Sequence, residues 1–565
     1  MYKITVRVSR ARGNAKSPFR SVYFKRPRHT KRAYKKGRKF MDYSRLRNGN
    51  DVRGVASAGV PGEEVNLTQT AAEHISRAFC LWLKKRLHKN RVLVAVGHDS
   101  RISAAELLSG VRTGVTQSGN DLLSTGLSST PSMFMLLQDE EFFGGKESLP
   151  DGSIMLTASH LPFNRNGLKF FIRESGLEAD DVKEILSLAS QFSEAEAKAA
   201  EAAATSTETP GTVREQSYMD KYSADLVKKV RKACGSETPL KGKKIIVDAG
   251  GGAGGFYAEK VLAPLGADTS GSQYLTPDGY FKGHIPNPEN ETAMRSICEA
   301  VKREKADFGI IFDTDVDRAG AVDSTGEEIN RNRLIALISA ILLSEKPGTI
   351  VTDSVTSDGL AEFIAAHGGR HHRFKRGYKN VINEAIRLNN AGEYAPLAIE
   401  TSGHAALKEN YFLDDGAYLV TRLLIALAQA AKQGKNLSDL IADLKMPAEA
   451  AELRFKFKPD CDFKTLGANL IAQLEEYAKT KPYITPAPDN HEGVRLNFDQ
   501  AHGAGWLLVR MSLHEPILPT NAESEKKGGA KKIVSELYAF LQRFDFLDLS
   551  PAEAYLGINS GIEKQ

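Results

Sequence analysis

Cysteine is scarce in this sequence, and long apolar runs are missing. The four cysteines among 565 residues lie far apart, at Cys80, Cys234, Cys298 and Cys461. None belongs to a CxxC pair or has a histidine at ligand spacing, which excludes a zinc module and a disulfide framework and indicates a reducing compartment. No run of about 18 uncharged apolar residues occurs, so we expect no membrane span. We therefore expect soluble chemistry or soluble binding.

Acidic residues are absent from the first 41 positions, which contain 15 Lys and Arg. The net charge of +6 is the sum of two opposite parts, this basic leader and an acidic body. Residues 42–565 hold 61 of the 76 basic residues and all 70 acidic ones, so the body carries a net charge of −9. Such an acidic body is not a general nucleic-acid binder. The leader fits a transit peptide, which would place the protein in the plastid stroma, a nucleic-acid arm, or an extension before a start at Met41 in a cytoplasmic protein. We favour the transit peptide.

The body alternates short apolar strands with amphipathic helices. Hydrophobic residues make up 41% of the chain and charged residues 26%, which is typical of a globular protein, and the length predicts three to five domains. Strand-and-loop patterns occur at residues 91–101, 243–255, 307–318 and 349–369. This alternation predicts an α/β protein with mostly parallel sheets, whose ligand-binding loops follow the carboxyl ends of the strands. Composition places domain boundaries within 193–211, near Arg331 and near Met446.

The first chemically informative loop follows the apolar segment Ser153–Thr157. It carries Ser159 beside His160, with Lys169 ten residues beyond the serine. Such a serine can act as a nucleophile or phosphoryl carrier if a base or a metal activates it. An ordinary Ser/Thr turn is the alternative.

A second loop carries three aspartates at alternate positions, Asp313, Asp315 and Asp317, followed by Arg318. Carboxylates with this spacing can turn inward together and supply the hard oxygen ligands that Mg²⁺ prefers. A calcium loop would need glycine at the sixth position and glutamate at the twelfth, where this chain has Arg318 and Ser324. We therefore predict a magnesium site, with a solvated acidic turn as the alternative.

The third loop holds Glu400, Ser402 and His404 after an apolar segment. Glutamate and serine together can hydrogen-bond the vicinal hydroxyls of a sugar, and His404 could transfer a proton. A helix cap is the alternative explanation of this loop.

In combination these three loops, in this order and at this wide spacing, resemble the α-D-phosphohexomutase superfamily, which includes phosphoglucomutase, phosphomannomutase and phosphoglucosamine mutase. The resemblance covers about residues 45–525. Further matches lie at Asp51–Gly54, Gly97–Arg101, Thr130–Pro131 and Lys375–Lys379. The details LPFNRNG and SLHEP resemble the plastid-type, phosphoglucosamine-mutase-like members of plants and algae.

The resemblance implies an α/β fold of four domains: three similar mixed α/β domains and a smaller C-terminal α+β domain around a central cleft. On this basis we expect the domains at 42–210 (phosphoserine loop), 211–331 (metal loop), 332–446 (sugar loop) and 447–549 (phosphate loop), after the leader at 1–41.

The resemblance also implies a mutase that interconverts hexose 1-phosphate and hexose 6-phosphate through a phosphorylated Ser159 and a hexose 1,6-bisphosphate. The expected metal ligands of Mg²⁺ are Ser159, Asp313, Asp315 and Asp317, and the expected catalytic residues are Ser159, His160, Lys169, Arg53 and His404. Glu400, Ser402 and Lys375 would bind the sugar, and Arg318, Arg510, Ser512 and His514 the phosphate. The resemblance leaves open which hexose is used and whether the protein is a monomer or a dimer.

The fourth loop departs from the family pattern. Leu513 stands where relatives have a glycine that allows close backbone approach to phosphate, and His514 replaces a hydroxyl residue. Ile399 and Leu161 are further departures, in the sugar loop and the phosphoserine loop. The fourth loop therefore keeps an alternative open, namely a catalytically weakened paralogue that binds sugar phosphates as a sensor or partner protein.

Overall fold

The computed structural model describes residues 41–199, 209–459, 461–512 and 515–558, with side chains omitted for 194–199. Apart from Met41, the basic leader lies outside these residues, and so do Leu513 and His514. Within the described ranges, no helix has both the length and the apolar character needed to cross a membrane.

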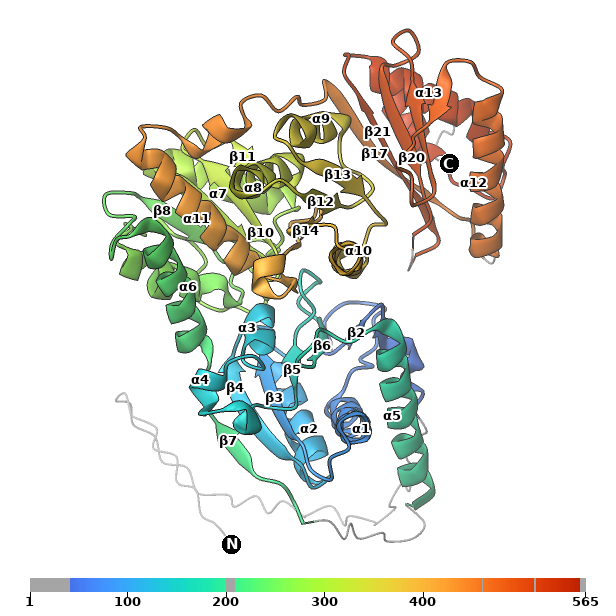
Figure 1. The fold of residues 1–565 in the computed structure, drawn as a ribbon. Helices are drawn as coiled ribbons and strands as arrows, with labels where there is room; N and C mark the ends of the chain where they lie inside the picture. The colour runs from blue at the N-terminus through green and yellow to red at the C-terminus, as the bar shows by residue number, and fades with distance from the viewer. Residues whose placement is uncertain (1–40, 200–208, 460, 513–514, 559–565) are drawn as a thin grey trace, which may run out of the picture. The chain divides into compact units, whose positions relative to one another are not determined.

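The first sheet contains seven strands in the order β1-β2-β6-β5-β3-β4-β7 (Figure 1). Its strands are β1 Arg47–Asn48, β2 Asp51–Val55, β3 Leu93–His98, β4 Asp121–Leu127, β5 Gly152–Leu156, β6 Arg165–Phe171 and β7 Val213–Glu215. The helices of this part are α1 Gln69–Leu87, α2 Ala104–Thr116, α3 Thr130–Met135, α4 Glu140–Phe143 and α5 Ala179–Ala199. The last strand, β7, comes after the boundary predicted at 210 and pairs in parallel with β4.

The second and third sheets are smaller, with strand orders β11-β10-β9-β8 and β13-β12-β14-β15-β16. The second comprises β8 Ile245–Asp248, β9 Phe308–Phe312, β10 Ala319–Asp323 and β11 Glu328–Ile329, with α6 Met219–Cys234 and α7 Glu291–Glu304. The third comprises β12 Thr349–Thr352, β13 Arg370–Arg373, β14 Leu397–Ile399, β15 Ala405–Leu407 and β16 Leu413–Asp414, with α8 Arg331–Glu345, α9 Asp358–Ala366, α10 Tyr378–Asn390 and α11 Gly416–Lys432.

The C-terminal sheet is antiparallel throughout, in the order β17-β21-β20-β19-β18. It comprises β17 Glu449–Lys456, β18 Ile484–Pro486, β19 Val494–Phe498, β20 Gly505–Val509 and β21 Ile517–Ser524, with α12 Phe463–Lys479, α13 Gly529–Leu541 and α14 Ser550–Leu556. The predicted architecture of three mixed α/β domains and a smaller α+β domain is therefore confirmed.

The expectation of mostly parallel sheets needs correction. In each of the first three sheets a parallel strand is followed by a tight return into an antiparallel neighbour, giving the pairs β5–β6, β9–β10 and β14–β15. The physical reason is loop length, because a connection of a few residues can only return antiparallel, whereas a parallel crossover needs a dozen or more. All three predicted catalytic loops are these hairpin connections, and the fourth loop joins β20 to β21 in the same way.

The cores follow the alternation of side chains along the strands. In the first sheet Val94 and Val96 face a cluster that includes residues of α1, α2 and α5, whereas Ala95 faces a second cluster. That second cluster continues through α6, β9, α8 and α11, so the first three sheets share apolar packing. The C-terminal sheet has its own core.

Two glycines of α2 allow α1 to approach closely. A Cβ atom at Gly110 would lie 2.2 Å from the backbone oxygen of Gln69, and one at Gly114 would lie 2.2 Å from that of Glu73. A side chain at either position would therefore force α1 and α2 apart.

We predict that Gly110→Ala destabilises the first domain by about 1–3 kcal/mol, because overpacking outweighs the higher helix propensity of alanine. Ala105→Ser, at an exposed position of the same helix, should change stability by less than about 1 kcal/mol. Denaturant unfolding followed by circular dichroism measures both. Equal stability of Gly110→Ala and the native chain would contradict the close helix contact.

Candidate active site

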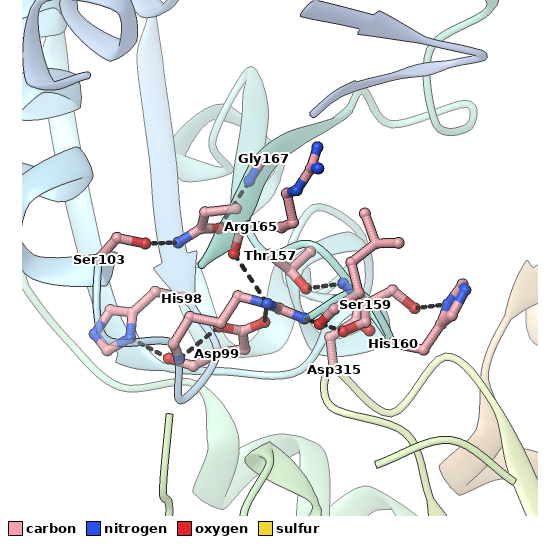
Figure 2. A network of polar contacts seen from close by, with 12 residues as sticks. His98, Asp99, Ser103, Thr157, Ser159, His160, Arg165, Gly167 and Asp315 are labelled. Carbon is pink, nitrogen blue, oxygen red and sulfur yellow. Dashed lines mark hydrogen bonds and ion pairs between the residues drawn. The ribbon is translucent and has the colours of Figure 1, made fainter. Parts of the chain in front are cut away.

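Ser159 lies in the hairpin loop between β5 and β6, and its hydroxyl faces the aspartate loop. Its Oγ donates to Asp313 Oδ2 at 2.8 Å. Its backbone N–H donates to Thr157 Oγ1 at 2.9 Å (Figure 2). Ser159 has a φ of +49°, a left-handed conformation that costs about 1–2 kcal/mol for a residue with a side chain. The loop therefore holds the serine in a strained backbone conformation, and the residue as a whole is 3% exposed.

The three aspartates of the second loop converge as the spacing predicts. Asp313, Asp315 and Asp317 are buried, and each offers an oxygen within 4.8 Å of the others. Burial, together with Asp317 and Asp315, raises the pKa of Asp313 well above its usual range. Asp315 Oδ1 and Asp317 Oδ1 are buried without a hydrogen-bond partner among the described residues. Clustered, partly unsatisfied carboxylate oxygens are the ligands that a hard divalent cation requires, so these residues fit a metal site.

Lys169 places a cation beside two of these carboxylates. Its Nζ lies 2.9 Å from Asp315 Oδ2 and also donates to Asp317 Oδ2. Burial acts to lower the pKa of Lys169, but Asp315 and Asp317 outweigh it and hold the pKa well above the ordinary value. Thr130 Oγ1 donates to the same Asp315 oxygen at 2.5 Å. The first domain thus contributes both the hydroxyl and a counter-charge to the loop of the second domain.

Arg53, on β2, reaches the start of the serine loop through a gap left by a glycine. Its guanidinium donates to the Thr157 backbone oxygen and pairs with Asp51 at 2.8 Å. Gly167 lies opposite Arg53 in the β2–β6 register, and a Cβ there would lie 2.8 Å from Arg53 Cδ. The absence of a side chain at Gly167 therefore lets Arg53 pass.

His160 and Arg318 flank the same region. His160 Nδ1 lies 3.5 Å from Ser159 Oγ, and Arg318 together with burial lowers the pKa of His160 far below its usual value (Figure 2). Arg318 NH1 is 3.6 Å from Glu289, and its backbone N–H donates to Asp313 Oδ1 at 3.2 Å. His160 is therefore neutral here, and the fixed positive charge is that of Arg318.

The third loop follows β14 and packs its polar side chains against the start of α10. Glu400 accepts the Gly377 N–H at 2.6 Å and the Ser402 hydroxyl at 3.2 Å. His404 Nδ1 is bonded to Asp414, and the imidazole stacks on Tyr378 with centroids 5.1 Å apart. Burial acts to lower the pKa of His404, but Asp414 outweighs it, so the pKa is raised.

Sequence reasoning missed the carboxylate behind this loop. Asp353, directly after β12, accepts from Thr401 Oγ1 at 2.9 Å and lies 3.8 Å from Arg376 Nε. Burial raises the pKa of Asp353 to about 7, against the opposing charge of Arg376. An aspartate that ends a buried strand is a signal that could have identified it.

Lys375 was predicted as a sugar ligand, and its side chain is exposed. The next residue, Arg376, turns inward, where Asp353 and Glu400 contribute to raising its pKa. Of these two neighbours, Arg376 is the one whose side chain lies near Asp353, behind the sugar loop.

The fourth loop follows β20. Arg510 NH1 lies 3.8 Å from Glu492, whose other oxygen accepts from Ser354 Oγ at 2.6 Å and from the Arg376 N–H at 3.1 Å. Ser512 Oγ accepts the Glu515 N–H at 3.2 Å. His514 lies outside the described residues. Glu492 thus connects Arg510 of the predicted phosphate loop to Ser354 and Arg376 of the third domain.

Comparison with known proteins gives a consistent result across the chain. Models of phosphoglucomutase/phosphomannomutase α/β/α domains I, II and III match residues 44–196, 217–326 and 330–446. The phosphoglucomutase of Neisseria gonorrhoeae is 28% identical over 494 residues, which is 87% of this chain and 95% of that protein. The phosphomannomutase/phosphoglucomutase of Pseudomonas aeruginosa is 28% identical over 487 residues, which is 86% of this chain and 92% of that protein.

Solved structures agree. A phosphoglucomutase/phosphomannomutase family protein from Burkholderia thailandensis superposes with a TM-score of 0.70 at 25% identity, covering 89% of this chain and 98% of that one. Parafusin from Paramecium shares the fold with a TM-score of 0.66 at 17% identity, covering 91% and 96%. These relatives give no support to the plastid-type subgroup indicated by LPFNRNG and SLHEP.

Three consecutive family domains, matched in order, cover most of the chain, and the predicted serine, aspartate and sugar loops lie within them. The chain belongs to the phosphoglucomutase/phosphomannomutase family and is a phosphohexomutase, an isomerase of the intramolecular phosphotransferase type.

Proposed function

We propose that the protein is a Mg²⁺-dependent mutase that moves a phosphoryl group between O1 and O6 of glucose, mannose or glucosamine phosphate. The reaction would proceed through phosphorylated Ser159 and a hexose 1,6-bisphosphate that returns its other phosphate to the serine. The observation that carries this proposal is the 2.8 Å contact of Ser159 Oγ with Asp313 in a buried cluster of three aspartates.

Asp313, Asp315 and Asp317, with the phosphate on Ser159, would hold the Mg²⁺. When bound, the ion offsets negative charge on the phosphoryl oxygens during in-line transfer. The two carboxylate oxygens without partners support this assignment.

The chain's own groups would move the protons and fix the charges. Lys169 is held protonated by Asp315 and Asp317, so it can donate a proton to the serine oxygen or the sugar oxygen as a bond to phosphorus breaks. His404, with Nδ1 held by Asp414, would exchange a proton through Nε2 when the sugar is reversed. Arg53 and Arg318 would donate to phosphoryl oxygens, and neutral His160 would orient the serine.

The remaining assignments concern substrate binding. Glu400 and Ser402 would bond ring hydroxyls shared by both orientations, and Lys375 would approach from the exposed side of the loop. Arg510, Ser512 and His514 would grip the phosphate that is not transferred. Because the hydroxyl contacts are common to all three sugars, a panel of glucose, mannose and glucosamine 1-phosphates decides the substrate.

The location in the plastid depends on residues 1–41 and stays a prediction. N-terminal sequencing of the protein from its native cells tests it, because a cleaved transit peptide would leave a mature start near Met41.

We predict that Ser159→Ala abolishes interconversion, because no hydroxyl remains to carry the phosphoryl group. Coupled assays with each hexose 1-phosphate, Mg²⁺ and the matching bisphosphate measure this, and mass spectrometry measures phosphate on Ser159. Ser153→Ala, in the same domain but outside the site, is the matched control. Turnover by Ser159→Ala comparable with the native enzyme would refute the phosphoserine route.

We predict that chelation of divalent cations by EDTA stops turnover and that added Mg²⁺ restores it. Asp315→Asn should lower kcat by about 10²-fold or more, because a charged ligand is lost while the shape of the side chain stays. Isothermal titration with Mg²⁺ provides a second readout, in which the variant should bind more weakly. Full activity in EDTA would contradict the metal site.

The weakened-paralogue alternative is favoured only by Leu513 and His514. It predicts saturable binding of sugar phosphate without turnover, and a sharp rise in kcat when Leu513→Gly and His514→Thr are combined. If the double variant turns over no faster than the native protein, the fourth loop is an adapted site.

A further inference from the structure

Arg101 holds the loop that carries Ser159. Its side chain is buried, with 2% of the residue exposed. NH1 donates to the backbone oxygens of Pro162 at 2.7 Å and Arg165 at 2.9 Å, and NH2 donates to those of Leu161 at 2.7 Å and Ser159. One guanidinium therefore bonds four carbonyl oxygens within a seven-residue stretch.

Arg101 is itself fixed to the end of β3. Its Nε lies 3.3 Å from Asp99 Oδ2, and its backbone N–H donates to Asp99 Oδ1 at 2.9 Å. The Asp99 N–H in turn donates to the Leu156 oxygen at 3.1 Å, at the end of β5. Asp99, Ser159 and Arg165, which all contact Arg101, lie close together in Figure 2. The hairpin loop is thus tied to two neighbouring parallel strands of its own sheet.

Only arginine can supply this set of bonds. Its guanidinium presents five N–H donors in a rigid plane, whereas a lysine ammonium presents three donors at one point. Without the guanidinium, buried loop carbonyls lose their partners, and the loop must rearrange to solvate them. A rearranged loop would no longer hold Ser159 in its left-handed conformation.

We propose that Arg101 is a positioning residue, which sets the direction of Ser159 Oγ for phosphoryl transfer by binding the four loop carbonyls. This inference rests on the proposed function, because the serine must be the phosphoryl carrier. Arg101 touches no reacting atom, so its effect is on kcat through the placement of the nucleophile.

The test compares the native enzyme with Arg101→Lys, and with Arg91→Lys as the matched control, since Arg91 forms an exposed pair with Asp121 in the same domain. For Arg101→Lys we expect kcat to fall by about 10²-fold, the effect of a displacement of about 1 Å, with KM changed by less than about threefold. The kcat of Arg101→Ala should fall further than that of Arg101→Lys. It should recover when millimolar guanidinium chloride is added, but not when potassium chloride is added. Arg91→Lys should retain the native kcat.

Hydrogen exchange of the amides at residues 159–166 gives a readout that needs no turnover. We expect faster exchange in Arg101→Lys than in the native enzyme at these amides, with unchanged exchange in the C-terminal domain. A folded Arg101→Lys with native kcat, or native protection of the loop, overturns the inference. If the native enzyme itself turns over no hexose phosphate, the proposed function fails, and the exchange experiment still decides whether Arg101 holds the loop.

Discussion

The mutual repulsion of three buried carboxylates is the constraint around which the active site is arranged. Asp313, Asp315 and Asp317 occupy one short turn, and neighbouring elements supply compensating groups: the Ser159 hydroxyl, the Lys169 ammonium, the Thr130 hydroxyl and the Arg318 backbone. Three of these groups come from the first domain. The electrostatic requirement of the second domain is therefore met by groups of the first domain, and these contacts hold the serine next to the aspartate loop.

The connections between strands determine where the groups that compensate the aspartates lie. Each catalytic loop joins a buried strand to its antiparallel neighbour, so both ends of the loop are fixed by backbone pairing. Lys169 is delivered by the returning strand of its hairpin, β6, and His404 stands at the end of the sugar loop, directly before β15. Because the hairpin doubles back on itself, Lys169, ten positions after Ser159, contacts Asp315.

Much of this was accessible from the sequence, since apolar strands followed by Asp, Ser and Gly loops mark the carboxyl ends of strands. The apolar segments located the three loops, and the alternate spacing of the aspartates predicted that they turn inward, but the roles of the loops and the four-domain arrangement came from the family resemblance. The antiparallel returns were missed, because an apolar run does not reveal the direction of its partner. Asp353, Arg376 and Arg101 were missed as contributors because their importance comes from tertiary contacts. Asp353 contacts Thr401, Arg376 lies beside Asp353, and Arg101 binds the carbonyls of the serine loop.

The hairpin connection has an evolutionary consequence. A loop between adjacent paired strands can change its residues, or lengthen, without altering the register of the sheet that supports it. In this chain Leu161 lies in the loop between β5 and β6, whereas Ile399 is the last residue of β14 and pairs with Ala405 of β15. Single substitutions within a loop can therefore change substrate preference, while the paired strands that support Ser159 and the three aspartates keep their register.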